Sequence, residues 1–253
     1  MNVNGIREIL IDRGRQILSE QVSCIKFTGG TAADVLVNDL QGHPHAFVVG
    51  CIMDRQVKSE QAWSIPYLIS EKLGDFCFST LKGLALTQVN ELMSQPKPLH
   101  RFPVEMSRNL HAAIALIGER YEGNAAGIWL GKPPSAEVVY RFLEFRGMGP
   151  KIATMAANIL VRHFKIPLSD YYSVDVSPDT HLRRVFARLG LSREDASPEE
   201  LIYRARALHP EFPGLMDFPA WDIGKSWCKA GKPLCGQCYM KELCPTAGKG
   251  VST

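Results

Sequence analysis

Apolar residues recur every three or four positions along most of the chain, which is the period of an α-helix with one buried face. Four such stripes, each expected to face a core, are formed by Ile6, Ile9, Leu10 and Ile17; by Leu110, Ala113, Ile114, Ile117 and Tyr121; by Ile152, Met155, Ala156, Ile159 and Leu160; and by Leu182, Val185, Phe186 and Leu189. Strand signals are weak, since residues 21–28 alternate poorly and residues 46–53 suit a buried strand or a buried helix. The pattern predicts an all-α protein.

Local start and stop signals support this prediction. Ser197 followed by Pro198 and Glu200 forms a capping box with proline at the first helical position, so a helix is expected from there to about Leu208. Breaks containing glycine or proline near residues 29–30, 95–98 and 131–134 are typical of loops between helices.

Composition narrows the class of protein. The chain has 253 residues, 45% of them hydrophobic and 22% charged, which favours a globular protein over a disordered or fibrous one. Apolar runs reach about eight residues, short of the roughly 18–20 that span a bilayer, so no membrane helix is expected. The first residues lack the pattern of a secretory signal, which favours an intracellular protein. The net charge of +3 means that any surface for a polyanion must be local.

Four of the seven cysteines lie within 17 residues near the C-terminus: Cys228, Cys235, Cys238 and Cys244. An odd total with one tight cluster favours a metal site in a reducing compartment over a set of disulfides. The spacers of six, two and five residues contain only one close pair, whereas structural zinc sites usually use two. A four-iron cluster takes one thiolate per iron and tolerates such spacing, so iron–sulfur is preferred and zinc remains the alternative.

The same loop is basic. It carries Lys225, Lys229, Lys232 and Lys241 with no acidic residue between the first and the last. Lysines on a loop tied by a metal centre suit contact with phosphate. The alternative is that they only solvate the loop or balance the charge of the cluster.

A Gly-x-Gly turn, Gly147 to Gly149, opens directly onto the helical stripe that begins at Ile152. Glycine permits a positive φ and close approach of another backbone, and Pro150 suits the first turn of a helix. The free N–H groups of such a turn form an anion site. No strand precedes the turn and a third glycine is missing, so it is not a dinucleotide fingerprint. Lys151 lies in the first turn of the helix that follows.

This helix–hairpin–helix, followed downstream by a C-x6-C-x2-C-x5-C loop, resembles the endonuclease III family of DNA glycosylases from about residue 39 to residue 245. The resemblance implies an all-α, two-lobed fold with an active-site cleft between its lobes. A six-helix domain with the hairpin is expected over residues 38–165. Residues 1–37 and 166–253 would form a helical domain with a [4Fe-4S] cluster on the four cysteines.

The resemblance also implies roles for single residues. Lys151 lies at the position of the family's catalytic lysine, and the Pro-Asp-Thr-His segment at residues 178–181 makes Asp179 the catalytic carboxylate. The segment at residues 53–56 is similar to the one whose glutamine enters the gap left by the extruded nucleotide. The residues expected to contact DNA are Gln56, Gly147, Gly149, Lys229 and Lys232.

Two departures from the family pattern leave alternatives open. An apparent insertion at residues 167–176 supplies Asp175 as a competing carboxylate. Asp179 could also be no more than the N-cap of the helix that follows it. The segment at residues 93–131 matches least, so the resemblance does not fix which base is removed.

The implied function is that of a base-excision repair DNA glycosylase with apurinic/apyrimidinic lyase activity. As a monomer on double-stranded DNA it would flip a damaged base, foremost an oxidised pyrimidine, or a mispaired base. Lys151 would cleave the glycosidic bond through a Schiff base, which requires a neutral amine that the helix N-terminus favours. In a prokaryote the protein would be cytoplasmic and associated with the nucleoid. The alternatives are a monofunctional glycosylase with another base preference, a non-catalytic iron–sulfur protein that binds DNA and senses redox state, and a zinc-stabilised binding module.

Overall fold

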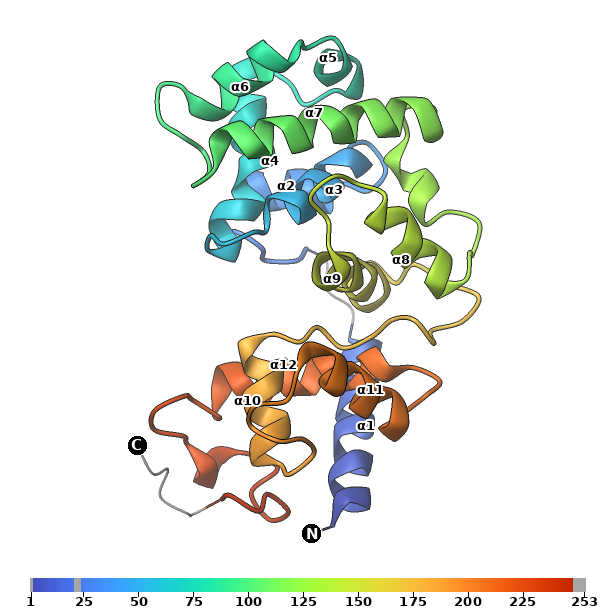
Figure 1. Ribbon diagram of the computed structural model, residues 1–253, viewed down its shortest axis with the longest axis vertical. Coiled ribbons are helices and arrows are strands. Elements are labelled where there is room, and N and C mark those ends of the chain that lie inside the picture. The colour runs from blue at the N-terminus through green and yellow to red at the C-terminus, as the bar shows by residue number, and fades with distance from the viewer. Residues whose placement is uncertain (1, 21–23, 248–253) are drawn as a thin grey trace. The chain divides into compact units, whose positions relative to one another are not determined.

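The computed structural model describes residues 2–20 and 24–247, and within these ranges it contains α-helices and short 3-10 helices but no strand (Figure 1). The all-α prediction is therefore confirmed. Residues 46–53 lie in a fully buried helix, and residues 24–28 form no strand. The remainder of the 21–28 segment lies outside the described residues. No helix in the described part is both long and apolar enough to cross a bilayer.

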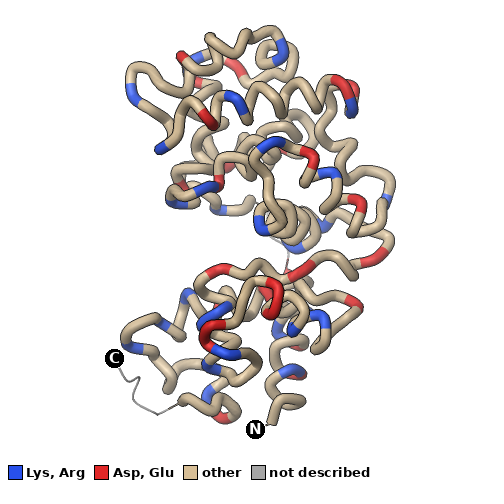
Figure 2. Tube along the Cα trace, viewed as in Figure 1, with Lys and Arg blue, Asp and Glu red and all other residues tan. Residues whose placement is uncertain are grey.

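The chain divides into two compact units, each with its own core. One unit comprises Val22–Pro133 and Glu137–Ala156 and is called the hairpin unit here. The other comprises Met1–Gln21, Pro134–Ala136 and Ala157–Thr253 and is called the cysteine unit. Figure 2 shows basic and acidic residues interspersed in both units, as expected from a small net charge.

The hairpin unit is built around one apolar helix. Its elements are α2 (Thr31–Asn38), α3 (Pro44–Met53), α4 (Ser59–Leu73), α5 (Phe78–Lys82), α6 (Leu86–Ser94), α7 (Pro103–Arg120), the 3-10 helix η1 (Ala125–Ile128), most of α8 (Ser135–Leu143) and the first half of α9 (Pro150–Arg162). Every residue of α3 is buried, and the helix packs against α2, α4, α7 and η1. Such all-round burial explains why the sequence of α3 shows no helical stripe.

The cysteine unit packs around α12. Its elements are α1 (Val3–Ser19), the second half of α9, α10 (Thr180–Arg188), α11 (Pro198–Leu208), η2 (Pro213–Met216), α12 (Asp217–Ser226) and η3 (Cys235–Gln237). α12 packs on α1, α10 and η2. The predicted capping box is confirmed, because Ser197 Oγ accepts from Glu200 N at 3.2 Å and Glu200 Oε2 accepts from Ser197 N at 2.7 Å.

Candidate functional site

The glycine turn joins α8 to α9 within the hairpin unit. Gly147 has a φ of +89°, and a Cβ there would lie only 2.4 Å from the buried Asn109 Nδ2, so both conformation and packing require glycine. A Cβ on Gly149 would meet nothing within 4 Å. The first glycine therefore shapes the turn, and the second keeps its outer side open.

The turn and the segment after α3 together line a cavity of about 520 Å³. Its walls are formed by Asp54, Arg55, Gln56, Gly147, Met148, Gly149, Pro150, Lys151 and Ile152. The structure therefore brings together four residues that the sequence singled out: Gln56, Gly147, Gly149 and Lys151. Gln56 itself has a left-handed backbone, with φ of +54°.

Lys151 is exposed at the rim of this cavity, in the first turn of α9. That turn holds no acidic residue. Lys151 therefore lies at the positive end of the α9 dipole, where the first N–H groups of the helix are free. An exposed amine beside an open cavity is within reach of a bound ligand, as a nucleophile must be.

Asp54 shares the cavity, although sequence reasoning did not assign it a role. The residue is half-buried, and this burial raises the pKa of its carboxyl group, while the charge of Lys151 and a hydrogen bond from the Trp63 side chain lower it. A signal in the sequence could have drawn attention to it: Asp54 precedes Arg55 and Gln56, in the segment that the resemblance to endonuclease III assigns to DNA contact.

Asp179 belongs to the cysteine unit, where it caps α10. Its Oδ1 accepts from Leu182 N at 2.7 Å, so the capping geometry considered from the sequence is present. Asp217 lies nearby, and its Oδ1 accepts from Ser177 N at 2.7 Å, which ties the loop before Asp179 to α12. Desolvation, together with the charge of Asp179, raises the pKa of Asp217 to about 7. Asp217 is a second carboxyl group that sequence reasoning missed.

Asp175 has a different environment. Its two carboxylate oxygens accept from Arg206 Nε and Nη2, each at 2.7 Å, and the residue is only 7% exposed. A bidentate pair of this kind occupies both oxygens. Because the group is sequestered by Arg206, the geometry favours Asp179 over Asp175 as the carboxylate available for chemistry.

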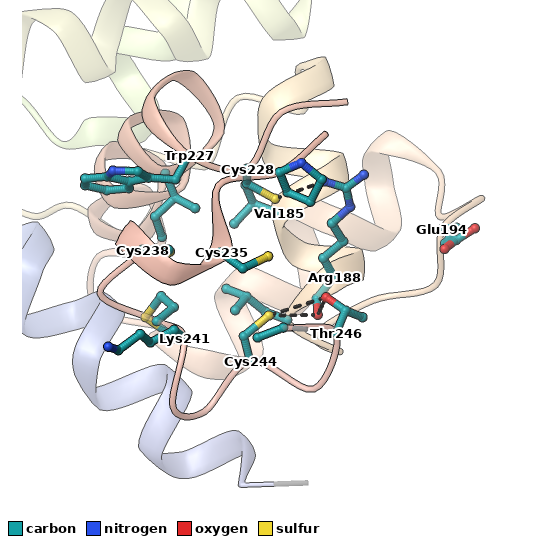
Figure 3. A pocket seen from close by; sticks show the side chains of 15 residues that line it. Val185, Arg188, Glu194, Trp227, Cys228, Cys235, Cys238, Lys241, Cys244 and Thr246 are labelled. Carbon is teal, nitrogen blue, oxygen red and sulfur yellow. Dashed lines mark hydrogen bonds between the residues drawn. The ribbon is translucent and has the colours of Figure 1, made fainter. Parts of the chain in front are cut away.

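The four clustered cysteines line one cavity of about 360 Å³ (Figure 3). Apolar side chains complete its wall: Val185, Leu189, Ile223, Trp227, Pro233 and Met240. None of the four cysteines forms a disulfide. Turns hold their spacing, since Cys238 N donates to Cys235 O at 3.1 Å and Cys244 N donates to Met240 O at 2.9 Å.

This donor set fits a polynuclear metal centre. Within the described residues, no three His, Cys, Asp or Glu side chains converge closely enough to hold a single ion. Four thiols spread around one cavity suit a cluster that takes one thiolate per iron better than zinc, whose sulfur ligands all lie about 2.3 Å from one atom. Burial raises the pKa of Cys238, and the three neighbouring cysteines raise it further, so the thiolates need positive charge in the cavity.

Arg188 of α10 ties this loop together, a role not anticipated from the sequence. Its Nη1 donates to Cys228 Sγ at 3.4 Å and to Lys229 O at 2.6 Å, and its Nη2 donates to Ala230 O at 2.9 Å. Figure 3 shows its side chain beside the Cys228 sulfur. The carbonyl of Arg188 accepts from Thr246 Oγ1 at 3.0 Å, so one residue contacts both ends of the loop.

The two lysines expected to contact DNA are exposed on this loop. Lys229 Nζ donates to the Lys225 carbonyl, and Lys225 lies over the Trp221 ring at 4.5 Å. Lys229 therefore also stabilises the loop. Lys232 projects from the same exposed stretch.

Relatives of the chain include endonucleases III, although no family model matches it. Endonuclease III of Synechocystis sp. is 30% identical over 143 residues, which cover 56% of each chain. Endonuclease III of Thermotoga maritima is 24% identical over 208 residues, 82% of this chain and 85% of that protein. The chain thus matches a little over half of the length of the first relative and most of the second.

Solved structures extend the likeness to nearly the whole chain. A trapped endonuclease III–DNA covalent intermediate has a TM-score of 0.62 at 17% identity, with 96% of both chains covered. A thermostable thymine-DNA glycosylase has a TM-score of 0.63 at 14% identity, covering 97% of this chain and 98% of that one. The fold is that of these endonuclease III and thymine-DNA glycosylase structures. In sequence, the chain is similar to endonucleases III.

Proposed function

We propose that this protein is a base-excision repair DNA glycosylase with an associated apurinic/apyrimidinic lyase activity. The observation that carries the proposal is the position of Lys151, in the first turn of α9 and in one cavity with the glycine turn and Gln56. A catalytic amine, an open backbone turn and a side chain able to enter a base stack are the components that such a reaction needs.

The proposed reaction begins when the enzyme extrudes the target nucleotide from the duplex. Gln56 fills the vacated position, and the backbone of the Gly147–Gly149 turn holds a phosphate. The neutral amine of Lys151 attacks the sugar C1′, the base departs, and the resulting Schiff base undergoes elimination that cleaves the strand. We assign to Asp179 the stabilisation of positive charge on the sugar and a part in moving the proton of Lys151.

We propose a [4Fe-4S] cluster as the group bound by Cys228, Cys235, Cys238 and Cys244. When bound, it would supply the positive charge that four half-buried thiolates require and would fix the loop that carries Lys229 and Lys232. These lysines then contact the DNA backbone. Iron near four per chain with a visible charge-transfer absorption is expected, and both signals should be lost in Cys238→Ser. A colourless protein loaded with zinc would refute this assignment.

Borohydride trapping on abasic-site duplex DNA tests the lyase proposal directly. Wild type is expected to form a covalent adduct, and Lys151→Ala is expected to form none. Lys58→Ala is the matched control, because Lys58 is also exposed in the same unit but does not line the cavity. An undiminished adduct in Lys151→Ala would remove this residue from its role. Wild type that binds DNA without trapping or base release would favour the non-catalytic alternative.

The preferred substrate is proposed to be an oxidised pyrimidine in double-stranded DNA, processed by a monomer. A second candidate is a monofunctional glycosylase with another base preference, which the equal likeness to the thymine-DNA glycosylase structure supports. A panel of duplexes containing oxidised pyrimidine, oxidised purine, uracil, alkylated base, G·T mismatch or abasic site distinguishes the two. Base release without strand cleavage or trapping would favour the second candidate.

A further inference from the structure

Trp221 of α12 differs from the other tryptophans in its surroundings. Trp63 and Trp129 are 1% and 2% exposed, and each stacks on another aromatic ring. Trp227 meets the ring of Tyr239 edge-on, with centroids 5.5 Å apart. Trp221 is 40% exposed instead. Its indole therefore offers a large apolar surface to a partner outside the protein.

A lysine lies over this exposed ring. Lys225 follows Trp221 by one helical turn, and its Nζ is 4.5 Å from the ring centroid. Cation–π attraction holds the ammonium group beside the indole. Among the described residues Lys225 forms no salt bridge, so its charge is available to an anion. The pair thus joins an apolar surface to a free positive charge.

The electrostatic surroundings of this pair favour an anionic partner. Lys229 is exposed, and its Nζ donates to the carbonyl of Lys225, which holds a second ammonium group against the same residue. Asp222, the nearest acidic residue in sequence, is engaged elsewhere, since its Oδ2 lies 3.8 Å from Arg13 Nη2. Free cations beside a paired acid attract a polyanion such as DNA.

The face of α12 that carries the pair borders the segment around Asp179. Asp217 Oδ1 accepts from Ser177 N at 2.7 Å. A Cβ on Gly224 would lie 2.7 Å from His181 Nδ1. α12 therefore touches the chain on both sides of Asp179. With 3.6 residues per turn, four residues of α12 fall within an arc of about 100°: Asp217, Trp221, Gly224 and Lys225.

Building on the proposed function, we propose that Trp221 and Lys225 form a binding site for the backbone of duplex DNA. Lys225 binds a phosphate, and the exposed indole packs against the deoxyribose next to it. The bases of a duplex are stacked inside, whereas phosphate and sugar lie outside and take most protein contacts. A cation fixed beside an apolar ring matches this alternation of charged and apolar groups along one strand. The site would hold the strand close to Asp179, within the cysteine unit.

Equilibrium binding of a labelled duplex, followed by fluorescence polarisation at several salt concentrations, tests both halves of this site. The duplexes are an undamaged one and one with a non-cleavable abasic analogue. Trp221→Ala should weaken binding about five- to tenfold at every salt concentration, because the indole buries apolar area but releases no counterion. Lys225→Gln should lower the slope of log affinity against log salt by about one, because one phosphate contact is lost.

Tyr203→Ala is the matched control. Tyr203 is a 66% exposed aromatic residue of the same unit, and Arg206 lies over its ring at 5.3 Å from the centroid. The guanidinium of Arg206 is paired with Asp175, so this ring has no free cation beside it. Both affinity and salt slope should equal those of wild type. An equal loss in Tyr203→Ala would overturn the proposal, since exposed aromatic area in general would then explain the effect.

A single-stranded oligonucleotide of the same sequence distinguishes a contact with the sugar from stacking on a base. Trp221→Ala should weaken duplex binding at least as much as single-strand binding. A loss confined to the single strand would overturn the sugar contact, because exposed bases stack on aromatic rings. Unchanged duplex affinity in Trp221→Ala, or an unchanged salt slope in Lys225→Gln, would overturn the site as proposed.

These results are separate from those that test the proposed function. A wild type that binds both duplexes but releases no base overturns the proposed function, while the two variants still decide the contact. A wild type that binds neither duplex overturns both. The helical circular dichroism spectrum checks folding. If Trp221→Ala does not fold, the salt slope of Lys225→Gln decides, since the side chain of Lys225 is exposed.

Discussion

Replacing Asp217 with asparagine should make the protein more stable, and increasingly so as the pH rises. Asparagine keeps an oxygen for the Ser177 N–H, which lies 2.7 Å from Asp217 Oδ1, but removes the ionisable group beside Asp179. The residue retains some exposed surface, yet its carboxyl group is desolvated, and this desolvation, together with Asp179, raises its pKa from 3.8 to about 7. Arg162 acts in the opposite direction but does not cancel the shift.

The size of this change in stability follows from the linkage between proton binding and the free energy of unfolding. A pKa higher in the folded than in the unfolded chain means that the folded state binds more protons, so the stability contributed by protonated Asp217 is lost as pH rises from about 4 to 7. A shift of roughly three units corresponds to about 4 kcal/mol at most. Between pH 5.5 and 8 the variant should gain about 2 kcal/mol in unfolding free energy over wild type, with no further gain above pH 8.

Urea unfolding at several pH values, with the variant and wild type side by side, measures this difference. Any pH dependence of the metal centre is common to both proteins and cancels. Asp195→Asn is the control, since the side chain of Asp195 is 80% exposed, and its difference from wild type should stay flat with pH. A flat difference for Asp217→Asn as well would refute the claim that this carboxyl group is held protonated in the folded protein.

Three further substitutions test other parts of the structure. Arg206→Met should lower the unfolding free energy by about 3 kcal/mol, because it leaves the Asp175 carboxylate buried without its partner. The double variant with Asp175→Asn should regain much of that loss, as measured by thermal unfolding. Gly147→Ala should cost about 1–3 kcal/mol in chemical denaturation and weaken binding to abasic-site DNA, since its Cβ would meet Asn109; unchanged binding would count against the turn as a phosphate site. Arg188→Met should accelerate chelator-induced loss of the visible absorption by about tenfold, and an unaltered rate would mean that its hydrogen bonds do not hold the loop.

Local signals in the sequence predicted most of the helical architecture, because caps and stripes act over a few residues. The helix from Pro198 to Leu208 ends where its pattern predicts. α3 was ambiguous for a physical reason: a helix buried on all sides has no polar face, so its period disappears. Its identity as a helix depends on the neighbours that surround it.

The same distinction between local sequence signals and the effect of surrounding residues applies to the candidate site. The glycine turn was found from residue types and spacing, and Lys151 and Gln56 through the resemblance to endonuclease III; one cavity contains them all. Asp54 and Asp217 were not singled out, since what distinguishes them is desolvation and the groups around them rather than a motif. The sequence favoured Asp179 and left Asp175 as a competitor, and the bidentate pair with Arg206 adds a physical reason to prefer Asp179.

α7 supports two residues that line the cavity around Lys151, or fill the space behind it. Its Asn109 fills the space beneath Gly147, and its Glu105 Oε1 lies 3.2 Å from Nη1 of Arg55, another residue that lines the cavity. A displacement of this one helix relative to α3 and α9 would disturb both contacts and alter the shape of the cavity. α7 lies within residues 93–131, the part of the chain least like the endonuclease III pattern. Sequence differences in that segment therefore change the dimensions of the cavity around Lys151 without changing any residue that lines it.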